Sequence, residues 1–223
     1  MRFSIKIPRP STMKVGKEEY HQLDAGTELH RIHPGIFDST QFNDTDKGNA
    51  RFSPIRDASG TIIPTIYAAQ SFECAACEII LRCPDTPPRV GTSVAPPDIV
   101  HPSDYRQHAH SHVRTTQVLN LASITSTGQR KIGVNGNGLL AGPRSTYPIT
   151  RSWAEQIHAN CPSAQGLYYI SYQYGLEFAV ILFGDRVPDD VLEPLSSRAV
   201  ADPSCHDEIQ KIAAMLSIDY EDV

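Results

Sequence analysis

Residues 62–81 combine a short apolar strand, an abrupt stop and an amphipathic helix, and they constrain the fold more than any other stretch. Ser71 is a preferred N-cap residue, and a carboxylate in the next turn suits the positive end of the helix dipole. Apolar residues recur at helical spacing along one face of this helix, namely Phe72, Ala75, Ala76, Ile79 and Ile80. Glu78 falls beside that face, so we expect its carboxylate at the rim of the core. We also expect Tyr67, at the end of the strand, to share one pocket with Glu78.

Size and charge limit the class of protein. A chain of 223 residues can form one domain with a sizeable core. Its net charge of −5 argues against general binding to nucleic acid or acidic membranes. No apolar run approaches the ~20 residues that span a bilayer, and residues 1–8 lack the apolar run of a signal peptide. The odd count of 5 cysteines suggests free thiols in a reducing compartment, so we expect a cytoplasmic protein.

Strand-like and helix-like segments follow one another without a regular βα alternation. We expect strands at residues 27–33, 114–125, 166–174 and 176–183. The last of these is nearly continuous in apolar residues, which favours a central strand. We expect helices at residues 17–23, 152–158 and 203–216. In the second of them, Ser152 and Glu155 stand at capping-box spacing. Residues 126–150 are rich in glycine and indicate a loop.

A proline-rich segment separates the first strands and helix from the rest. Six prolines stand between positions 84 and 102, a density that neither a helix nor a central strand tolerates. We interpret residues 83–113 as a long surface excursion within a single domain that spans residues 1–223. We place the core at about residues 28–187 and a C-terminal helical tail at residues 188–223.

Two clusters invite metal or redox chemistry. Cys74 and Cys77 lie near a helix N-terminus, where a thiolate is favoured, but no second ligand pair follows at a familiar zinc spacing. We interpret both as packing residues. His108, His110 and His112 alternate, so on a strand they share one face and could hold an ion. With His101, they follow the proline-rich segment, and a solvated strand edge is the preferred interpretation, with metal binding as the alternative.

The residues near the opening motif also have ordinary explanations. Arg31 suits a surface strand, and Tyr67 suits the core with its hydroxyl satisfied. Glu78 stands four residues before Arg82, the spacing of an ion pair on a helix surface. Arginine nevertheless matches phosphate geometry well, so Arg31 and Arg51 are candidates for binding a nucleotide diphosphate.

Several of these segments together resemble the RES domain family. The resemblance is carried by Arg31, by residues 49–54, and by residues 66–78 with Tyr67 and Glu78 at the family's spacing. Further along, residues 166–171 resemble the family's strand that ends in a serine, here Ser171. The similarity runs from about residue 28 to residue 187.

The resemblance implies an α+β fold similar to that of ADP-ribosyltransferases, with a mixed β-sheet core, flanking helices and the proline-rich excursion. It implies an enzyme that consumes NAD⁺ by hydrolysis or phosphorolysis, with NAD⁺ as substrate and no metal required. It also implies a toxin of a bacterial toxin–antitoxin pair with an Xre-like antitoxin as partner. We expect no direct nucleic-acid partner and no membrane, and the sequence leaves both a monomer and a homodimer open.

The implied roles are specific. Glu78 is the catalytic carboxylate, and Arg31 and Arg51 bind the pyrophosphate or adjacent ribose. Tyr67 packs on the nicotinamide–ribose end, and Ser171 contacts the substrate or orients Glu78. Two alternatives remain: a protein ADP-ribosyltransferase on the same scaffold, and a non-catalytic module that binds a metal or nucleotide.

Overall fold

The computed structural model describes residues 6–82 and 98–222. Its centre is an 8-stranded sheet with the strand order β1-β8-β9-β10-β5-β2-β7-β11. The strands, in chain order, are β1 (Tyr20–Leu23), β2 (Glu28–Pro34), β5 (Thr65–Ala69), β7 (His108–Thr115), β8 (Leu119–Ser123), β9 (Gly166–Ile170), β10 (Phe178–Phe183) and β11 (Leu192–Ala199). Neighbouring strands are antiparallel, except that β8 and β9 are parallel. The fold is therefore α+β with a mixed sheet, as expected.

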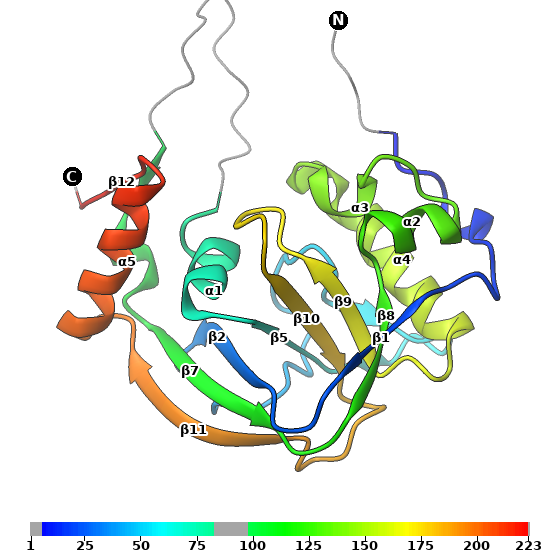
Figure 1. The fold of residues 1–223 in the computed structure, drawn as a ribbon, viewed down its shortest axis with the longest axis horizontal. Helices are drawn as coiled ribbons and strands as arrows, with labels where there is room; N and C mark the ends of the chain where they lie inside the picture. Colours follow the sequence, from blue (N-terminus) through cyan, green and yellow to red (C-terminus); the bar gives the residue numbers. More distant parts are fainter. Residues whose placement is uncertain (1–5, 83–97, 223) are drawn as a thin grey trace, which may run out of the picture.

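A bent two-stranded ribbon curls this sheet (Figure 1). The chain runs from β1 into β2 and from β7 into β8, and β1 pairs with β8 while β2 pairs with β7. At the corner, the amide of Gly26 donates to the carbonyl of Thr115 at 2.8 Å, so the pairing continues through the bend. In one arm of the ribbon β2 pairs with β5, and in the other arm β8 pairs with β9. The sheet therefore curves back on itself.

The curled sheet has apolar side chains on both faces. Along β10, Ile181 and Phe183 belong to the core shared with the helices, whereas Val180 and Leu182 belong to a second core on the opposite face. Strand β10 is thus buried on both sides, and its predicted central position is confirmed. Gly166 allows β9 to approach β10 closely, because a Cβ there would lie 2.0 Å from the carbonyl oxygen of Ile181.

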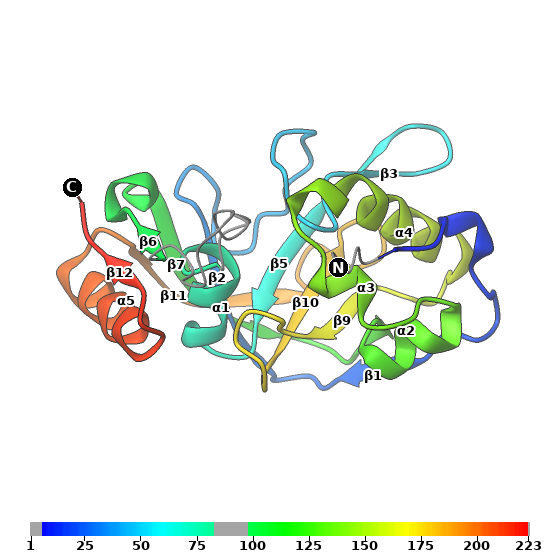
Figure 2. The same ribbon diagram turned by 90° about the horizontal axis from the view of Figure 1, so that it is seen from above.

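The helices cover one face of the sheet in two groups (Figures 1 and 2). Helices α1 (Phe72–Ile79) and α5 (Pro203–Met215) lie over the end formed by β2, β7 and β11. The other end carries α2 (Ser126–Ile132), α3 (Gly138–Ala141) and α4 (Tyr147–Asn160). Short 3₁₀ turns occur at Pro10–Thr12, Pro102–Tyr105 and Arg144–Thr146. None of the helices in residues 6–82 and 98–222 is long and apolar enough to cross a membrane.

Two small sheets complete the described fold. Strands β3 (Ile55–Arg56) and β4 (Ile62–Ile63) form an antiparallel hairpin between the loop after β2 and strand β5. Strand β12 (Asp219–Tyr220) pairs in parallel with β6 (Ile99–Val100). This second pair ties the C-terminal segment to the chain just before β7.

Two sequence predictions are wrong, and in the first of them tertiary pairing overrides local propensity. Residues 17–23 were expected to be helical, but residues 20–23 form strand β1, which pairs with β8. Residues 126–150 were expected to be a loop, but they contain α2, α3 and the start of α4. These helices make the crossover that parallel strands such as β8 and β9 require.

Other predicted boundaries also shift. The expected excursion at residues 83–113 contains β6 and the first part of β7, while residues 83–97 lie outside the described residues. The expected helical tail at residues 188–223 contains strand β11 as well as α5. The expected strand at residues 114–125 is the end of β7 followed by β8.

The predicted cap of the middle helix is also wrong. Helix α4 begins at Tyr147, so Ser152 lies inside it, and the Ser152 hydroxyl donates to the carbonyl of Pro148 at 3.1 Å.

Candidate active site

A cavity of about 550 Å³ opens beside helix α1 and contains most of the predicted site residues. It is lined by residues of β2, β5 and α1, by the loops around residues 36–51 and 172–173, and by Leu140 of α3. Figure 2 shows β5, β10 and β9 between α1 and α3. A volume of this size lies within the range of about 300–1,000 Å³ that is usual for small-molecule sites.

Helix α1 positions Glu78 on this cavity. The Ser71 hydroxyl accepts a hydrogen bond from the Cys74 amide at 3.0 Å, which confirms Ser71 as the N-cap. The same hydroxyl donates to the Glu177 carboxylate, so the helix start is joined to the turn after β9. With the apolar face of α1 turned into the core, Glu78 is half-buried and lines the cavity together with Tyr67. The predicted shared pocket is confirmed.

Two hydroxyl groups orient the Glu78 carboxylate. The Ser171 hydroxyl donates to Oε1 at 2.6 Å, and the Tyr169 hydroxyl donates to Oε2 at 3.4 Å. Ser171 is itself buried, with 2% of its surface exposed, and its oxygen accepts from the Tyr174 amide at 3.0 Å. Because its one proton is directed to Glu78, Ser171 is arranged to hold a carboxylate rather than to attack a substrate.

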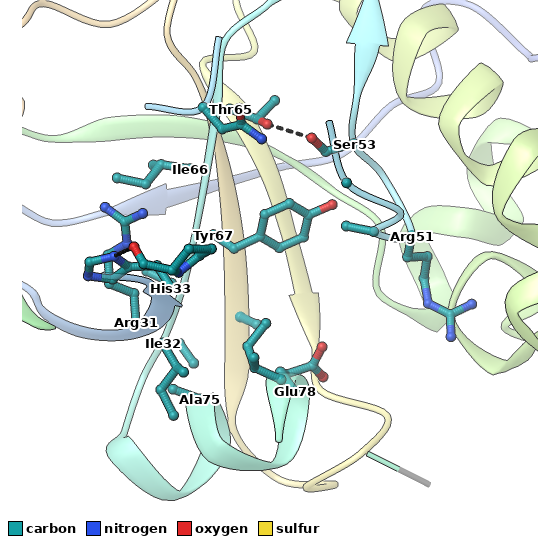
Figure 3. Close-up of a pocket in the computed structure, with 18 of the residues that line it drawn as sticks. Arg31, Ile32, His33, Arg51, Ser53, Thr65, Ile66, Tyr67, Ala75 and Glu78 are labelled. Carbon is teal, nitrogen blue, oxygen red and sulfur yellow. Dashed lines mark hydrogen bonds between the residues drawn. The ribbon is translucent and has the colours of Figure 1, made fainter. Parts of the chain in front are cut away.

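Tyr67 stands in the wall of the cavity with its hydroxyl directed toward the loop that carries Arg51 (Figure 3). The hydroxyl oxygen accepts from the Phe52 amide at 3.0 Å. Burial raises the Tyr67 pKa above its ordinary value, and the nearby Glu78 carboxylate raises it further. Tyr67 therefore stays neutral and presents its ring to the cavity.

Arg31 enters the cavity wall from β2 on the other side of Tyr67 (Figure 3). It is buried, and its Nη1 donates to the carbonyls of Asp38, Ser39 and Gln41 at 3.3, 2.7 and 3.3 Å. Burial lowers its pKa to about 10, so it remains charged at neutral pH. Its Nε is buried without a hydrogen-bond partner among the described residues. Arg31 is therefore no ordinary surface residue.

Arg51 approaches the same cavity from the loop before β3. Its Nη1 donates to the carbonyl of Gly142 at 2.8 Å and to that of Leu139 at 3.4 Å. Its Cζ also lies 4.8 Å from the centre of the Tyr147 ring. Figure 3 shows Arg31 and Arg51 on opposite sides of Tyr67. The cavity therefore has positive charge on both sides and the Glu78 carboxylate between them.

The ion pair with Arg82, which was the ordinary alternative explanation of Glu78, does not form. Arg82 instead donates to the Tyr147 hydroxyl. Across residues 6–82 and 98–222, neither Glu78 nor Arg82 makes an ion pair. Glu78 is thus a carboxylate oriented by neutral hydroxyls and left open toward the cavity.

Sequence reasoning missed Tyr169 and the pair formed by Arg82 and Tyr147. A signal for Tyr169 was present, because it stands two residues before Ser171, and alternate residues of a strand share a face. No local signal joins Arg82 to Tyr147, since their contact spans 65 positions.

The cysteine pair is consistent with packing. Cys74 and Cys77 are fully buried, and burial raises the pKa of each thiol to about 12. Both therefore remain protonated and unreactive at neutral pH.

The histidine segment is not a solvated strand edge, so that interpretation is wrong. Strand β7 lies between β2 and β11, and His110 is buried. Within the part of the chain that the structure describes, no group of three or more His, Cys, Asp or Glu side chains could hold a metal ion.

Residues 28–204 match the family model of the RES domain, which spans well over half of the chain. The chain belongs to the RES domain family, and the match extends past the core end expected at about residue 187. Among solved structures, this protein is similar to a chain in a structure described as "Crystal structure of the M.tuberculosis MbcT-MbcA toxin-antitoxin complex". The TM-score is 0.57 and the sequence identity is 12%. The superposed region covers 87% of this chain and 93% of that one. No curated protein matches by sequence.

Proposed function

We propose that this chain consumes NAD⁺ by cleaving the bond between nicotinamide and ribose, with Glu78 as the catalytic carboxylate. One observation carries the proposal: Glu78 opens on a cavity flanked by arginines, and its two oxygens are held by Ser171 and Tyr169. Membership of the RES domain family supports it, because the RES resemblance implies NAD⁺ chemistry.

The chemistry needs a fixed negative charge. As the carbon–nitrogen bond breaks, its electron pair leaves with nicotinamide, and positive charge develops on the ribose ring. A carboxylate that is already oriented where this charge develops stabilises the transition state without reorganisation. When water attacks C1 of the ribose, Glu78 would accept the proton that the water loses as the new carbon–oxygen bond forms. A phosphate dianion would attack through an unprotonated oxygen and would need no base.

The rest of the cavity fits the other parts of a dinucleotide. Arg31 and Arg51 place positive charge on the cavity wall, where a pyrophosphate can bind. The ring of Tyr67 stands next to Glu78 and would pack on the nicotinamide–ribose end, which keeps bulk water from the reacting carbon. The proposal assigns no role to a metal ion.

We further propose that the chain is the toxin of a bacterial toxin–antitoxin pair with an Xre-like antitoxin. The fold shared with a chain of the MbcT–MbcA toxin–antitoxin complex supports this role. Expression of the wild-type chain should arrest growth, and expression of Glu78→Gln at the same level should not.

Separation of the products by chromatography tests the reaction itself. The purified chain is incubated with NAD⁺ in phosphate-free buffer and in phosphate buffer. Nicotinamide with ADP-ribose in both buffers would identify a hydrolase, and ADP-ribose phosphate formed only with phosphate would identify a phosphorylase. Transfer of ADP-ribose exclusively to added protein would identify the alternative ADP-ribosyltransferase. NAD⁺ that stays intact in every mixture would contradict the proposal.

A further inference from the structure

Two arginines that line the cavity, from distant parts of the chain, converge on one buried tyrosine. Arg51 precedes β3, Arg82 follows α1, and both line the cavity. The Cζ atoms of Arg51 and Arg82 lie 4.8 and 5.7 Å from the centre of the Tyr147 ring. We propose that Arg51 and Arg82, held against Tyr147, form an anion subsite that binds a phosphate group.

Each guanidinium is anchored through one nitrogen. Arg51 uses Nη1 for the carbonyls of Leu139 and Gly142, and Arg82 uses Nη2 for the Tyr147 hydroxyl. A guanidinium has five N–H donors in a planar fork. Within the described ranges the remaining donors of Arg51 and Arg82 make no hydrogen bond, so they are available to an oxyanion.

Tyr147 makes the arrangement rigid. Its side chain is buried, with 1% of its surface exposed, and it stands at the start of the 14-residue helix α4. The ring face attracts a cation and its hydroxyl accepts from Arg82, so it restrains both long side chains before any ligand arrives. A ligand therefore binds with a smaller loss of side-chain entropy.

In the described part of the chain, no carboxylate pairs with Arg51 or Arg82. Other arginines of the chain pair with acidic side chains, among them Arg114 with Glu193 and Arg198 with Glu208. No such partner of Arg51 or Arg82 occurs in residues 6–82 and 98–222. Two like charges that face one cavity favour an anion between them, and the guanidinium fork matches phosphate oxygens.

The phosphate could come from two sources, and this part of the inference rests on the proposed function. One is the pyrophosphate of NAD⁺. The other is inorganic phosphate that acts as the acceptor of ADP-ribose, because Arg82 stands only four residues after Glu78. The two sources predict different kinetic effects of the same substitution.

The test compares Arg82→Gln with Arg106→Gln, which removes the same charge from an exposed arginine paired with Asp222 outside the cavity. Three quantities are measured: the KM for NAD⁺, the dependence of turnover on inorganic phosphate, and calorimetric binding of pyrophosphate. Loss of a charged hydrogen-bonding group should weaken phosphate binding about 10- to 100-fold. Tyr147→Phe keeps the ring and removes the hydroxyl, so it should weaken binding less than Arg82→Gln does.

The outcomes separate the subsite from the reaction. A raised KM for NAD⁺ in Arg82→Gln supports the pyrophosphate as occupant, and a weakened phosphate dependence supports the acceptor. If the wild-type chain leaves NAD⁺ intact but binds pyrophosphate more tightly than Arg82→Gln, the proposed reaction fails and the subsite stands. If Arg82→Gln matches Arg106→Gln in all three measurements, the subsite is overturned.

Discussion

Two polar clusters lie near helix α1, and they use their polar atoms in opposite ways. In the carboxylate cluster (Glu78, Ser171 and Tyr169), two hydroxyls hold a carboxylate that still faces the cavity. In the histidine cluster (His30, His110 and His112), the rings stack on one another, with the His30 ring 5.2 Å from that of His110 and 4.3 Å from that of His112. The sequence indicates Glu78 and Ser171 of the first cluster and His110 and His112 of the second as candidates. The structure adds Tyr169 to the first cluster and His30 to the second.

Arg198 determines where the protons lie in the histidine cluster. It forms an ion pair with Glu208 and donates from Nε to Nδ1 of His110 at 3.3 Å. Since that nitrogen accepts, Nε2 of His110 carries the proton and donates to Nδ1 of His30 at 3.0 Å. Phe72 of α1 covers the His110 ring, with the ring centres 4.5 Å apart. Both nitrogens of His110 are thus in use.

The two clusters therefore differ in whether their polar atoms can bind a ligand. His110 has no lone pair left for a metal or a substrate, and burial lowers its pKa to about 3. Glu78 faces a cavity that is flanked by arginines, and its hydroxyl partners orient the carboxylate without neutralising its charge. A cluster of titratable residues therefore indicates a functional site only when its atoms remain available to a ligand.

The largest expected effect comes from Glu78→Gln. The substitution keeps the shape of the side chain but removes the charge that would face the developing cation, so kcat should fall about 100- to 1,000-fold. Steady-state NAD⁺ turnover measures this, with Glu73→Gln on the same helix as the matched control. Turnover by Glu78→Gln equal to that of the control would remove Glu78 from the mechanism.

A smaller effect is expected from Ser171→Ala. Loss of the hydrogen bond to Glu78 leaves the carboxylate present but less well oriented, so kcat should fall about 10-fold while KM changes little. The split between kcat and KM separates orientation of Glu78 from substrate binding. Ser196→Ala, at an exposed serine, serves as control. A raised KM with unchanged kcat would instead place Ser171 in contact with the substrate.

His110 should affect stability rather than catalysis. Its pKa is about 3 in the folded chain and ~6.5 when unfolded, so acidification across that window favours the unfolded state. This histidine makes the free energy of unfolding fall by up to about 1.4 kcal/mol per pH unit as the pH decreases. Urea titrations at several pH values should show a shallower dependence for His110→Gln than for His101→Gln. Equal slopes would show that His110 is not held neutral.

The smallest effect is expected from chelation. Treatment with EDTA, followed by gel filtration, should leave NAD⁺ turnover unchanged, because the proposal gives no role to a metal. Loss of turnover that zinc restores would instead assign chemistry to a metal site.

Local features of the sequence were sufficient to predict the strand–turn–helix at residues 62–81. A side-chain cap and an apolar face act over a few residues, so the cap at Ser71 and the rim position of Glu78 are both observed. Strand β1 was missed because its conformation depends on pairing with β8, about 100 residues away.

Contacts across the cavity depend on the whole fold. Glu78 and Ser171 stand 93 positions apart, and only the family resemblance placed them together before the structure did. Neither the sequence pattern nor the family resemblance predicted that Arg82 bonds to Tyr147 instead of Glu78. That contact requires α1 and α4 to be positioned against each other. The burial of the histidine segment likewise follows from the position of β7 between β2 and β11.

The most direct test places the two clusters in one assay. NAD⁺ depletion is followed for the wild-type chain, Glu78→Gln and His110→Gln at neutral pH, with circular dichroism confirming that each chain is folded. We predict that the wild type and His110→Gln deplete NAD⁺ at rates within about threefold of each other, whereas Glu78→Gln leaves it almost intact. Equal depletion by Glu78→Gln, or loss of depletion in a folded His110→Gln, would contradict the assignment of chemistry to the carboxylate cluster.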